Sequence, residues 1–424
     1  MLSLSKLKRL RALLREEETL PPRWFVRKDP AAIDDPEPAF LYQSWIPEHT
    51  DKLIHLLGRG GSLPFQDIGM FTEPSDKELR KEIMRFAERQ EKIFDRMVTH
   101  RLSQHRNTAL GLIVTLDWVP AMRRLVYGAS RLGLPTILVP HESVFAKQSM
   151  YYTHPKMGMN VPVCDLVLAW GDLQEQIFLS RGYPAERIIK VGAPKFDYLS
   201  SAAIRNGKGA ARSLDLDPAR PIVAFIAQPL DSQYDTRVAR IRQNAAVVDL
   251  ISIAKSHGLQ VIVRLPPSRD NVLDAEVARQ IEADPDLALD DPSLYILTAE
   301  ETIAASDVVV SFNSTMLLEA ALANKVAVAS KYIEFDQIWD KLKIPVARSK
   351  DELERIVVAA AVNPERYVEQ YDVQWAASAF GVGAFDGAAS LRIQEVLNRV
   401  RAGALSINRG YAAAHPELLS GPAR

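Results

Sequence analysis

From residue 109 onward, short apolar runs alternate with amphipathic stretches. The first series predicts strands at 110–116, 135–139, 165–169 and 187–191, and helices at 120–132 and 173–181. Strands that alternate with helices in this way are typical of βαβ units, whose strands pair in parallel. This part of the chain is therefore expected to form one parallel sheet covered by helices.

A second series of the same kind begins after residue 217. Its predicted strands lie at 222–227, 260–265, 294–297, 308–311 and 326–330. Its predicted helices lie at 236–257, 272–283, 299–305 and 315–323. Residues 200–217 are small, polar and basic, as is typical of a linker. The pattern predicts an α/β protein with two doubly wound, Rossmann-like domains that face a central cleft. We place the domains at 1–205 and 206–400, with a C-terminal tail at 401–424.

The chain before residue 109 has a different pattern. Leucines at helical spacing among Lys and Arg predict a basic amphipathic helix within residues 1–19, which either packs on its own domain or docks on an anionic membrane surface. Residues 20–75 are rich in Pro and aromatic side chains and are expected to be irregular with short helices. From Asp76 to His105 apolar residues recur at helical spacing, which predicts one long amphipathic helix.

Composition narrows the functions that are open to this chain. The 424 residues contain 52 Lys and Arg against 53 Asp and Glu, so no net positive charge is available to attract nucleic acid. The single cysteine, Cys164, cannot form an internal disulfide, and no apolar run is long enough to span a bilayer. We expect a cytoplasmic protein whose contact with the inner face of the membrane, if any, runs through residues 1–19.

Polar side chains follow predicted strands of the first domain. Carboxyl ends of parallel strands face the ligand, so these residues are candidates for catalysis. Asp117 follows the strand at 110–116, and His141 and Glu142 follow the strand at 135–139. Because a carboxylate or an imidazole can take a proton from a hydroxyl, Asp117 or Glu142 is a candidate general base, with His141 as its substitute. The alternatives are helix capping by Asp117 and turn formation by His141 and Glu142.

The second domain has candidates for binding a nucleotide. A segment rich in Ser, Thr and Asn joins the strand at 308–311 to the next helix, and a helix N-terminus with hydroxyl donors suits a phosphate, although it also suits a plain helix cap. Glu319 lies four residues into that helix, where it can accept hydrogen bonds from ribose hydroxyls. Arg264 can pair with a phosphate or carboxylate. The candidates for nucleotide binding are Gln228, Arg264, Ser311, Asn313, Ser314, Thr315 and Glu319.

The sequence contains no motif that is typical of a metal site or of an organic cofactor site. The histidines are scattered, and no spacing of His and Cys suits a zinc site. No Gly-x-Gly-x-x-Gly run opens a predicted helix, which argues against a nicotinamide enzyme. We therefore expect neither a metal nor a cofactor.

Several runs of residues resemble known enzymes. The segments 165–172 and 182–197 resemble the closing part of the N-terminal domain in GT-B-fold sugar-nucleotide enzymes. The segments 306–328 and 385–393 resemble bacterial glycosyltransferases of capsule and surface-polysaccharide assembly. The resemblance covers about residues 109–400, and its motifs are moderately specific.

This resemblance implies a metal-independent GT-B glycosyltransferase. Such an enzyme moves a sugar from a CMP-, UDP- or GDP-linked donor to a glycan or glycolipid acceptor, as in the synthesis of capsule or lipopolysaccharide. The C-terminal domain would bind the donor, and the N-terminal domain, with Lys195, the acceptor. In capsule transferases His-Pro commonly follows the strand that here ends at Leu265, and this chain has Pro266-Pro267 instead. That departure leaves the identity of the donor open.

The same segments are similar to UDP-N-acetylglucosamine 2-epimerases, which share the fold. There Asp117 and Glu142 would match catalytic acidic positions. Three departures favour a transferase: the Gly-Thr-Arg-Pro opening strand is missing, the Asp-Ser-Gly-Gly loop reads Phe-Asn-Ser-Thr at 312–315, and the His-Arg-x-Glu-Asn segment reads Gln-Pro-Leu-Asp-Ser at 228–232. A GT-B scaffold that binds a nucleotide without catalysis is the third interpretation.

Overall fold

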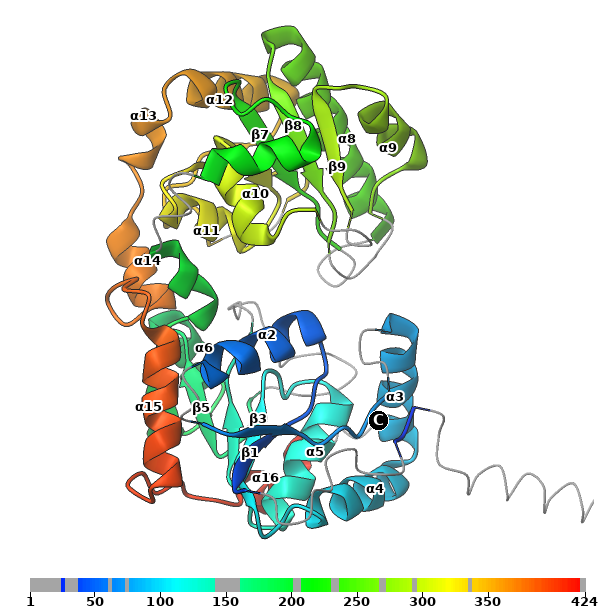
Figure 1. The fold of residues 1–424 in the computed structure, drawn as a ribbon, viewed down its shortest axis with the longest axis vertical. Coiled ribbons are helices and arrows are strands. Elements are labelled where there is room, and N and C mark those ends of the chain that lie inside the picture. Colours follow the sequence, from blue (N-terminus) through cyan, green and yellow to red (C-terminus); the bar gives the residue numbers. More distant parts are fainter. Residues whose placement is uncertain are drawn as a thin grey trace, which may run out of the picture. The chain divides into compact units, whose positions relative to one another are not determined.

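The fold is described from a computed structural model of the chain (Figure 1). The residues that the structure describes are 24–26, 37–59, 63–72, 76–141, 161–200, 207–229, 236–266, 272–291, 296–334 and 338–419. They form two compact units. The first holds the described residues up to 141, those from 161 to 168 and those from 394 onward, and the second holds those from 169 to 393. The helix predicted within residues 1–19 lies outside the described residues.

The first sheet has six strands in the order β2-β1-β3-β4-β5-β6. The strands are β1 Ala39–Tyr42, β2 Phe65–Asp67, β3 Ala109–Val114, β4 Thr136–Leu138, β5 Leu166–Ala169 and β6 Ile188–Lys190. The last four confirm the strands predicted after residue 109. The expectation that 20–75 is irregular is wrong for β1 and β2, which pair in parallel with each other, and β1 also pairs in parallel with β3.

Among the described residues, the first unit contains five complete α-helices besides its sheet, and polar residues mark both ends of one of them. The helices are α2 Pro47–Gly58, α3 Lys77–Arg89, α4 Glu91–Ser103, α5 Pro120–Arg131 and α16 Tyr411–Ala414. Asp76 caps α3 by accepting from the amides of Glu78 and Leu79. The prediction of one long helix is wrong, because Gln90 leaves the helical conformation at φ −119° and ψ 44° and divides α3 from α4.

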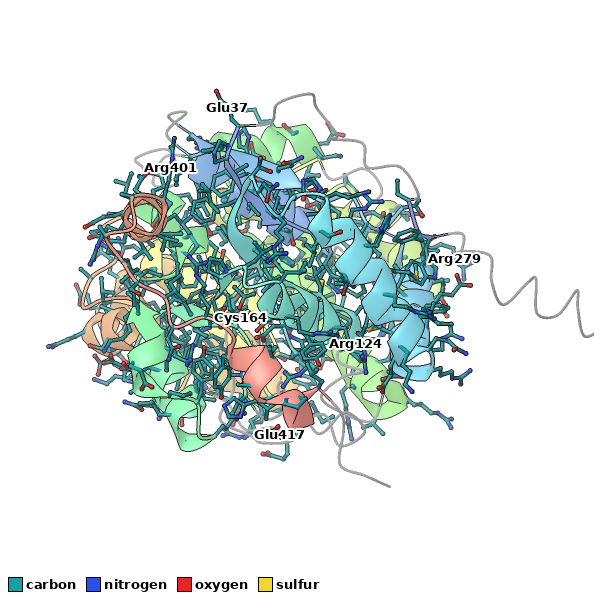
Figure 2. All side chains as sticks on the ribbon, turned by 90° about the horizontal axis from the view of Figure 1, so that it is seen from below. Glu37, Arg124, Cys164, Arg279, Arg401 and Glu417 are labelled. Carbon is teal, nitrogen blue, oxygen red and sulfur yellow. The ribbon has the colours of Figure 1, made fainter. Side chains whose placement is uncertain are left out.

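Charged side chains join α4 to α5. Arg124 of α5, labelled in Figure 2, forms ion pairs with Glu91 at 2.6 Å and with Asp95 at 2.8 Å, both on α4. Only 6% of the Arg124 side chain is exposed. Cys164, also labelled in Figure 2, is buried, and burial raises the pKa of its thiol well above the usual range. Its environment therefore suits a packed core residue.

The second sheet also has six strands, in the order β12-β11-β10-β7-β8-β9. The strands are β7 Ile222–Ile226, β8 Gln260–Arg264, β9 Leu287–Asp290, β10 Val308–Ser311, β11 Val326–Ser330 and β12 Val346–Ala347. All the pairings between neighbours are parallel. The strand predicted at 294–297 is wrong at residues 296–297, which form a bend, and residues 294–295 lie outside the described residues. β8 pairs with β7 on one side and with β9 on the other.

Alternate residues of the second sheet enter two separate cores. Val223 and Phe225 of β7 pack with Leu250 of α8 (Thr236–His257). Ile222 and Ala224 face the opposite side and join a cluster that includes buried residues of α10 (Ala299–Ala305) and α11 (Met316–Leu322). Because both faces are covered, every residue of β7 is buried and apolar. The predicted doubly wound arrangement is confirmed.

The remaining helices of the second unit and the elements beside it complete the fold. They are α6 Asp172–Ser180, α9 Ala275–Glu282, α10 Ala299–Ala305, α11 Met316–Leu322, α12 Lys350–Val362, α13 Glu365–Val368, α14 Val373–Phe380 and α15 Ala389–Arg401, with the 3-10 helices η2 Pro194–Ser200 and η3 Gly207–Leu214. The linker prediction is wrong for η3, because Ala211 and Leu214 are buried in the core of the second unit. Residues 201–206 lie outside the described residues.

The contacts divide the chain differently from the predicted boundary at residue 205. Residues 169–200 belong to the second unit, since Trp170, Ala193 and Phe196 share a core with Ile222 and Ala224. The end of the chain returns to the first unit, where α16 packs on α5. There the Tyr411 amide donates to Asp165 at 2.8 Å. Among the described residues, no helix combines the length and apolar character that a membrane span requires.

Candidate functional site

The side chain of Gln228 ties together the carboxyl ends of β7 and β10. Its Oε1 atom accepts hydrogen bonds from the Asn313 amide at 2.7 Å and from the Ser311 hydroxyl at 3.3 Å. The backbone of Gln228 is held in turn by Gln243 of α8, which accepts from its amide at 2.9 Å and donates to its carbonyl at 3.1 Å. The predicted nucleotide-binding residues Gln228, Ser311 and Asn313 therefore lie together.

The loop that follows β10 is fixed at both ends. Trp339, a buried side chain, donates its indole N–H to Oδ1 of Asn313 at 2.9 Å. The Ser314 hydroxyl accepts from the Met316 amide at 3.2 Å. Because that bond uses only the oxygen of Ser314, its O–H proton is left for a further acceptor. The loop thus presents a hydroxyl donor at a fixed position.

Beside this loop lies a cluster of four side chains, Lys195, Tyr198, Thr315 and Glu319. The ammonium of Lys195 is 2.8 Å from Oε1 of Glu319 and donates to Oγ1 of Thr315 at 2.9 Å. Thr315 donates to the same Glu319 oxygen at 3.2 Å, and the Tyr198 hydroxyl donates to Oε2 at 2.6 Å. The structure thus joins two predicted nucleotide-binding residues to Lys195, which the sequence resemblance assigns to the acceptor.

Burial decides the charges in this cluster. The Glu319 side chain is 5% exposed, and a carboxylate so deeply buried needs a nearby cation and hydrogen-bond donors. Lys195, at 32% exposure, supplies the cation while it keeps contact with solvent. Burial, followed by the charge of Glu319, raises the pKa of Tyr198 far above its usual value. Tyr198 therefore stays protonated and donates its hydrogen bond at every physiological pH.

The segment that carries Lys195 and Tyr198 is held in place by its own neighbours. Asp197 accepts hydrogen bonds from the amides of Ala389 at 2.9 Å and Ser390 at 2.7 Å, and so caps the N-terminal end of α15. Phe196 packs edge-on against Trp170 and Phe385. Sequence patterns gave no signal for Tyr198 or Asp197, because their partners lie 121 and 192 to 193 residues away along the chain.

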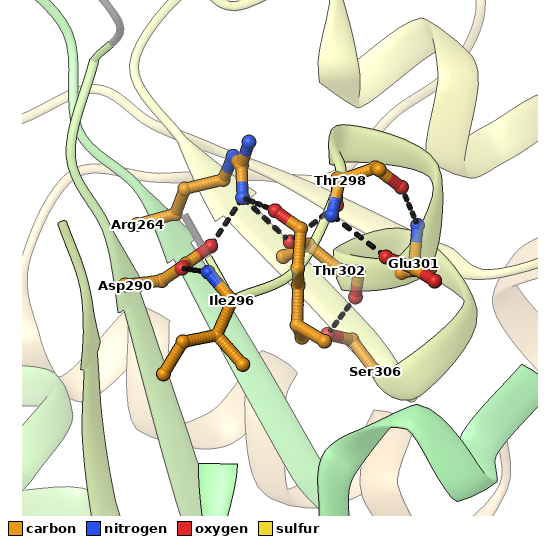
Figure 3. Close-up of polar contacts among 8 residues, drawn as sticks. Arg264, Asp290, Ile296, Thr298, Glu301, Thr302 and Ser306 are labelled. Atoms are coloured by element: carbon orange, nitrogen blue, oxygen red, sulfur yellow. Dashed lines mark hydrogen bonds and ion pairs between the residues drawn. The ribbon is translucent and has the colours of Figure 1, made fainter. Parts of the chain in front are cut away.

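Arg264, predicted to bind a phosphate, is engaged in a buried network of the second unit (Figure 3). It forms an ion pair with Asp290, and its NH1 group also donates to the Leu297 carbonyl at 2.8 Å and to the Thr302 hydroxyl at 3.1 Å. Desolvation raises the pKa of Asp290, and the charge of Arg264 opposes that rise. The guanidinium charge is thus already paired within the domain, and phosphate binding by Arg264 stays a prediction.

Asp117, a candidate base of the first unit, is fully buried. Its Oδ2 atom accepts hydrogen bonds from the amides of Val163 at 2.7 Å and Cys164 at 3.2 Å. These bonds order the residues that lead into β5 rather than cap α5, so the structure shows a local structural function for this carboxylate. Its predicted catalytic function stays a prediction.

His141 lies at the carboxyl end of β4 with a defined orientation. Its Nδ1 atom is 2.9 Å from the carbonyl oxygen of Thr115, and its ring lies 4.8 Å from the ring of His49 on α2. A carbonyl oxygen only accepts, so Nδ1 carries a proton, and in the neutral ring the lone pair is on Nε2. Thr115 also contacts Thr50 of α2 through its hydroxyl, at 3.0 Å. Glu142 lies outside the described residues.

The structure shows whether side chains gather into a group that could bind a metal, and which residues each unit contributes to the candidate site. Among the described residues, no three side chains of His, Cys, Asp or Glu come together as metal ligands would. The predicted cleft between the domains stays a prediction. The second unit holds the cluster of Lys195, Tyr198, Thr315 and Glu319, and the first holds the oriented imidazole of His141.

Comparisons with known proteins give the fold. No family model and no curated protein matches the chain. Among solved structures, the wall teichoic acid polymerase TagF is similar, with a TM-score of 0.54 and 12% identity over 87% of this chain and 90% of TagF. MnaA of S. aureus, in a co-structure with UDP, has a TM-score of 0.56 and 12% identity over 87% of this chain and 97% of MnaA. The chain has a GT-B fold.

The GT-B fold is shared by more than one activity. The UDP-GlcNAc 2-epimerase of Methanocaldococcus jannaschii is similar too, with a TM-score of 0.52 and 12% identity over 85% of this chain and 98% of the epimerase. The predicted resemblance to GT-B enzymes is thus confirmed for the fold. At such identities the likeness says nothing of the reaction, which has to be argued from the residues.

Proposed function

We propose that this chain is a GT-B glycosyltransferase that uses a nucleotide-sugar donor. The observation that carries the proposal is the group of polar side chains at the carboxyl ends of β7 and β10, where Gln228 holds the loop and Lys195, Thr315 and Glu319 contact one another. Ligands of doubly wound folds bind at this end of the sheet. Paired charges and hydroxyl donors at that position suit a molecule that combines ribose hydroxyls with phosphates.

The structural neighbours support a nucleotide as the ligand. The MnaA structure holds UDP, and one TagF structure was obtained with CDPG. In the present chain we assign the donor nucleotide to the second domain. Ser314 would donate its hydroxyl proton to a phosphate oxygen, and Glu319 would accept from a ribose hydroxyl through Oε2, where Tyr198 alone donates among the described residues.

His141 is the group that we propose as the base on the acceptor. Its Nδ1–H is directed at the Thr115 carbonyl, so Nε2 of the neutral ring takes the proton of the acceptor hydroxyl. The hydroxyl oxygen then forms a bond to the anomeric carbon, and the bond from that carbon to the nucleotide phosphate oxygen breaks. The nucleotide leaves with the electron pair. Asp117 and Glu142 are the alternative bases, and the acceptor is a glycan or glycolipid of surface-polysaccharide assembly.

An assay in D2O tests this proposal against the alternatives. The protein is incubated with CMP-, UDP- and GDP-sugars, with and without glycan or glycolipid acceptors, and products are followed by mass spectrometry and NMR. A transferase releases nucleotide in proportion to glycosylated acceptor and leaves the hydrogen at C2 of the sugar unexchanged. Failure of every donor and acceptor pair, together with saturable nucleotide binding, would contradict the proposal and support a scaffold that only binds.

An epimerase is the second candidate, because the UDP-GlcNAc 2-epimerase of Methanocaldococcus jannaschii has a TM-score of 0.52, in the same range as the 0.54 of TagF. It predicts the opposite outcome in the same assay. Deuterium would enter C2 of a UDP-sugar when no acceptor is present, and the nucleotide would stay attached or be released without glycosyl transfer. This result would replace the transferase proposal.

A further inference from the structure

Lys195 has a hydrogen-bond donor that its contacts with the described residues do not use. An ammonium group carries three N–H bonds, and the structure pairs that of Lys195 with Oε1 of Glu319 at 2.8 Å and with Oγ1 of Thr315 at 2.9 Å. The side chain is 32% exposed, so the third N–H is within reach of a ligand. The ammonium also lies over the ring of Phe196, 5.4 Å from its centroid.

The buried carboxylate fixes the direction of that ammonium. Glu319 is held by Tyr198 and Thr315 as well as by Lys195, and it lies in α11. A long, flexible lysine side chain that is tied to a rigid carboxylate loses less conformational entropy when it binds a ligand than a free one does. Glu319 therefore orients Lys195 beside the loop of Ser314 before any ligand arrives.

We propose that Lys195 binds a phosphate group of the donor nucleotide, and not the acceptor. This inference rests on the proposed function, and it names the part of the donor that this residue recognises. The ammonium contacts Thr315, whose neighbour in the chain is Ser314, and the O–H proton of Ser314 has no acceptor among the residues that the structure describes. An ammonium that contacts Thr315 and a hydroxyl on the residue before it offer two kinds of donor to phosphate oxygens, which only accept.

The alternative is that Lys195 only neutralises Glu319. Without Lys195, the buried Glu319 carboxylate has no cation beside it, which destabilises the folded protein around it. Its negative charge would also repel a phosphate, so removing Lys195 would weaken phosphate binding even if Lys195 never contacts the phosphate. The test therefore has to separate direct contact from charge compensation. The pair Lys195 and Glu319 allows this, because both charges can be removed together.

The experiment measures dissociation constants by calorimetry for a nucleoside, its monophosphate and its diphosphate, in the cytidine, uridine and guanosine series. We expect Lys195→Met to weaken binding of the phosphate-bearing ligand by about tenfold to a hundredfold while the nucleoside binds as before. The monophosphate and diphosphate arms show which phosphate Lys195 contacts. Lys208→Met is the matched control, because Lys208 is also 32% exposed and also pairs with an acidic residue, Asp307, at 2.8 Å.

The double variant Lys195→Met with Glu319→Gln decides between the two functions. It has the same net charge as the native pair but lacks the ammonium. Because Glu319→Gln also alters the proposed ribose contact in every ligand, the measured quantity is the ratio of the dissociation constants of nucleoside and nucleotide, and direct contact predicts that this ratio stays small in the double variant. If the phosphate increases the affinity of the double variant over that for the nucleoside as much as it does in the native protein, the inference is overturned, because Lys195 would then act only on Glu319. Unfolding midpoints of both variants, compared with the native protein, confirm that they are folded.

The outcomes also separate this inference from the proposed function. If the native chain binds no ligand of any series, the proposed function and the inference both fail. If the native chain binds nucleotides and Lys195→Met retains the full gain from phosphate, only the inference fails. Lys195→Arg, which keeps the charge, should retain most of the phosphate affinity.

Discussion

Two buried charged side chains of this protein, Arg264 and Glu319, differ in whether the residue that pairs with them is buried or reaches the solvent. Arg264 is 7% exposed and lies among acceptors of its own domain, Asp290, Leu297 and Thr302. Glu319, at 4% exposure, is more deeply buried still but contacts a partly exposed lysine. The first arrangement stabilises the fold, whereas the second brings a charge to the surface of a candidate site.

Arg264→Met should destabilise the protein strongly. Its removal leaves the Asp290 carboxylate buried without a cation, which costs about 3–5 kcal/mol in free energy of unfolding. Arg220→Met is the control, because the pair of Arg220 and Asp286 is exposed at 36% and 43% and is worth at most about 1 kcal/mol. Urea unfolding followed by circular dichroism measures both. Equal effects of the two variants would show that Arg264 is not the structural residue described above.

His141→Gln should lower turnover by about a hundredfold or more, since it removes the proposed base. Stability should change little, because the side chain is partly exposed. Its control is His100→Gln, at an exposed position of α4, which should retain native turnover. Steady-state rates with the donor identified in the D2O assay provide the measurement, and native activity of His141→Gln would assign the base to another residue.

At the scale of elements, the capping contact of Asp197 links a helix to the candidate site. Asp197 lies between Lys195 and Tyr198 and accepts from two amides at the start of α15. Lys195 and Tyr198 both contact Glu319. One carboxylate thus fixes both the beginning of a helix of 13 residues and the segment that carries the proposed phosphate-binding lysine.

Asp197→Ala should therefore reduce stability by about 1–2 kcal/mol and also weaken nucleotide binding, because η2 loses its anchor on α15. Asp197→Asn, which keeps an accepting oxygen, should lie much closer to the native protein in both measurements. Asp76→Ala removes a comparable cap from α3 and should reduce stability without changing nucleotide affinity. Denaturation and calorimetry on the three variants provide the data. Native affinity in Asp197→Ala would mean that the cap does not position Lys195.

Elements with a long local pattern could be predicted from the sequence, and short or long-range features could not. The strands β7, β8, β10 and β11 are buried at every position and contain runs of three or more consecutive apolar residues, which a pattern reveals. β1 and β2 have four and three residues, and they lie in a region rich in Pro, so their pairing leaves no periodic signal. The break at Gln90 does not interrupt the apolar spacing either.

The candidate site shows the same division between local and long-range information. Gln228 and the loop from Ser311 to Thr315 were predictable because polar residues at strand ends meet at one edge of a sheet. Tyr198 and the pairing of Lys195 with Glu319 depend on contacts across more than 120 residues, which only the folded chain brings together. The fully buried position of Asp117 likewise depends on packing rather than on sequence pattern.

At the scale of the whole molecule, the chain forms two Rossmann-like sheets of a GT-B fold, each with parallel pairing between strands. The second unit carries the Gln228 loop and the cluster of Lys195, Thr315 and Glu319. We expect this unit to hold the nucleotide of a sugar donor. The claim concerns binding and can be tested before any acceptor is known.

Thermal unfolding in the presence of CMP, CDP, UDP and GDP tests this claim most directly. A ligand at about a hundred times its dissociation constant stabilises the native state by about 2.7 kcal/mol. We expect at least one nucleotide to raise the unfolding midpoint by about 5 °C or more, and inorganic phosphate and ribose 5-phosphate at the same concentration to have a smaller effect. An unchanged midpoint with all four nucleotides at millimolar concentration would contradict the account.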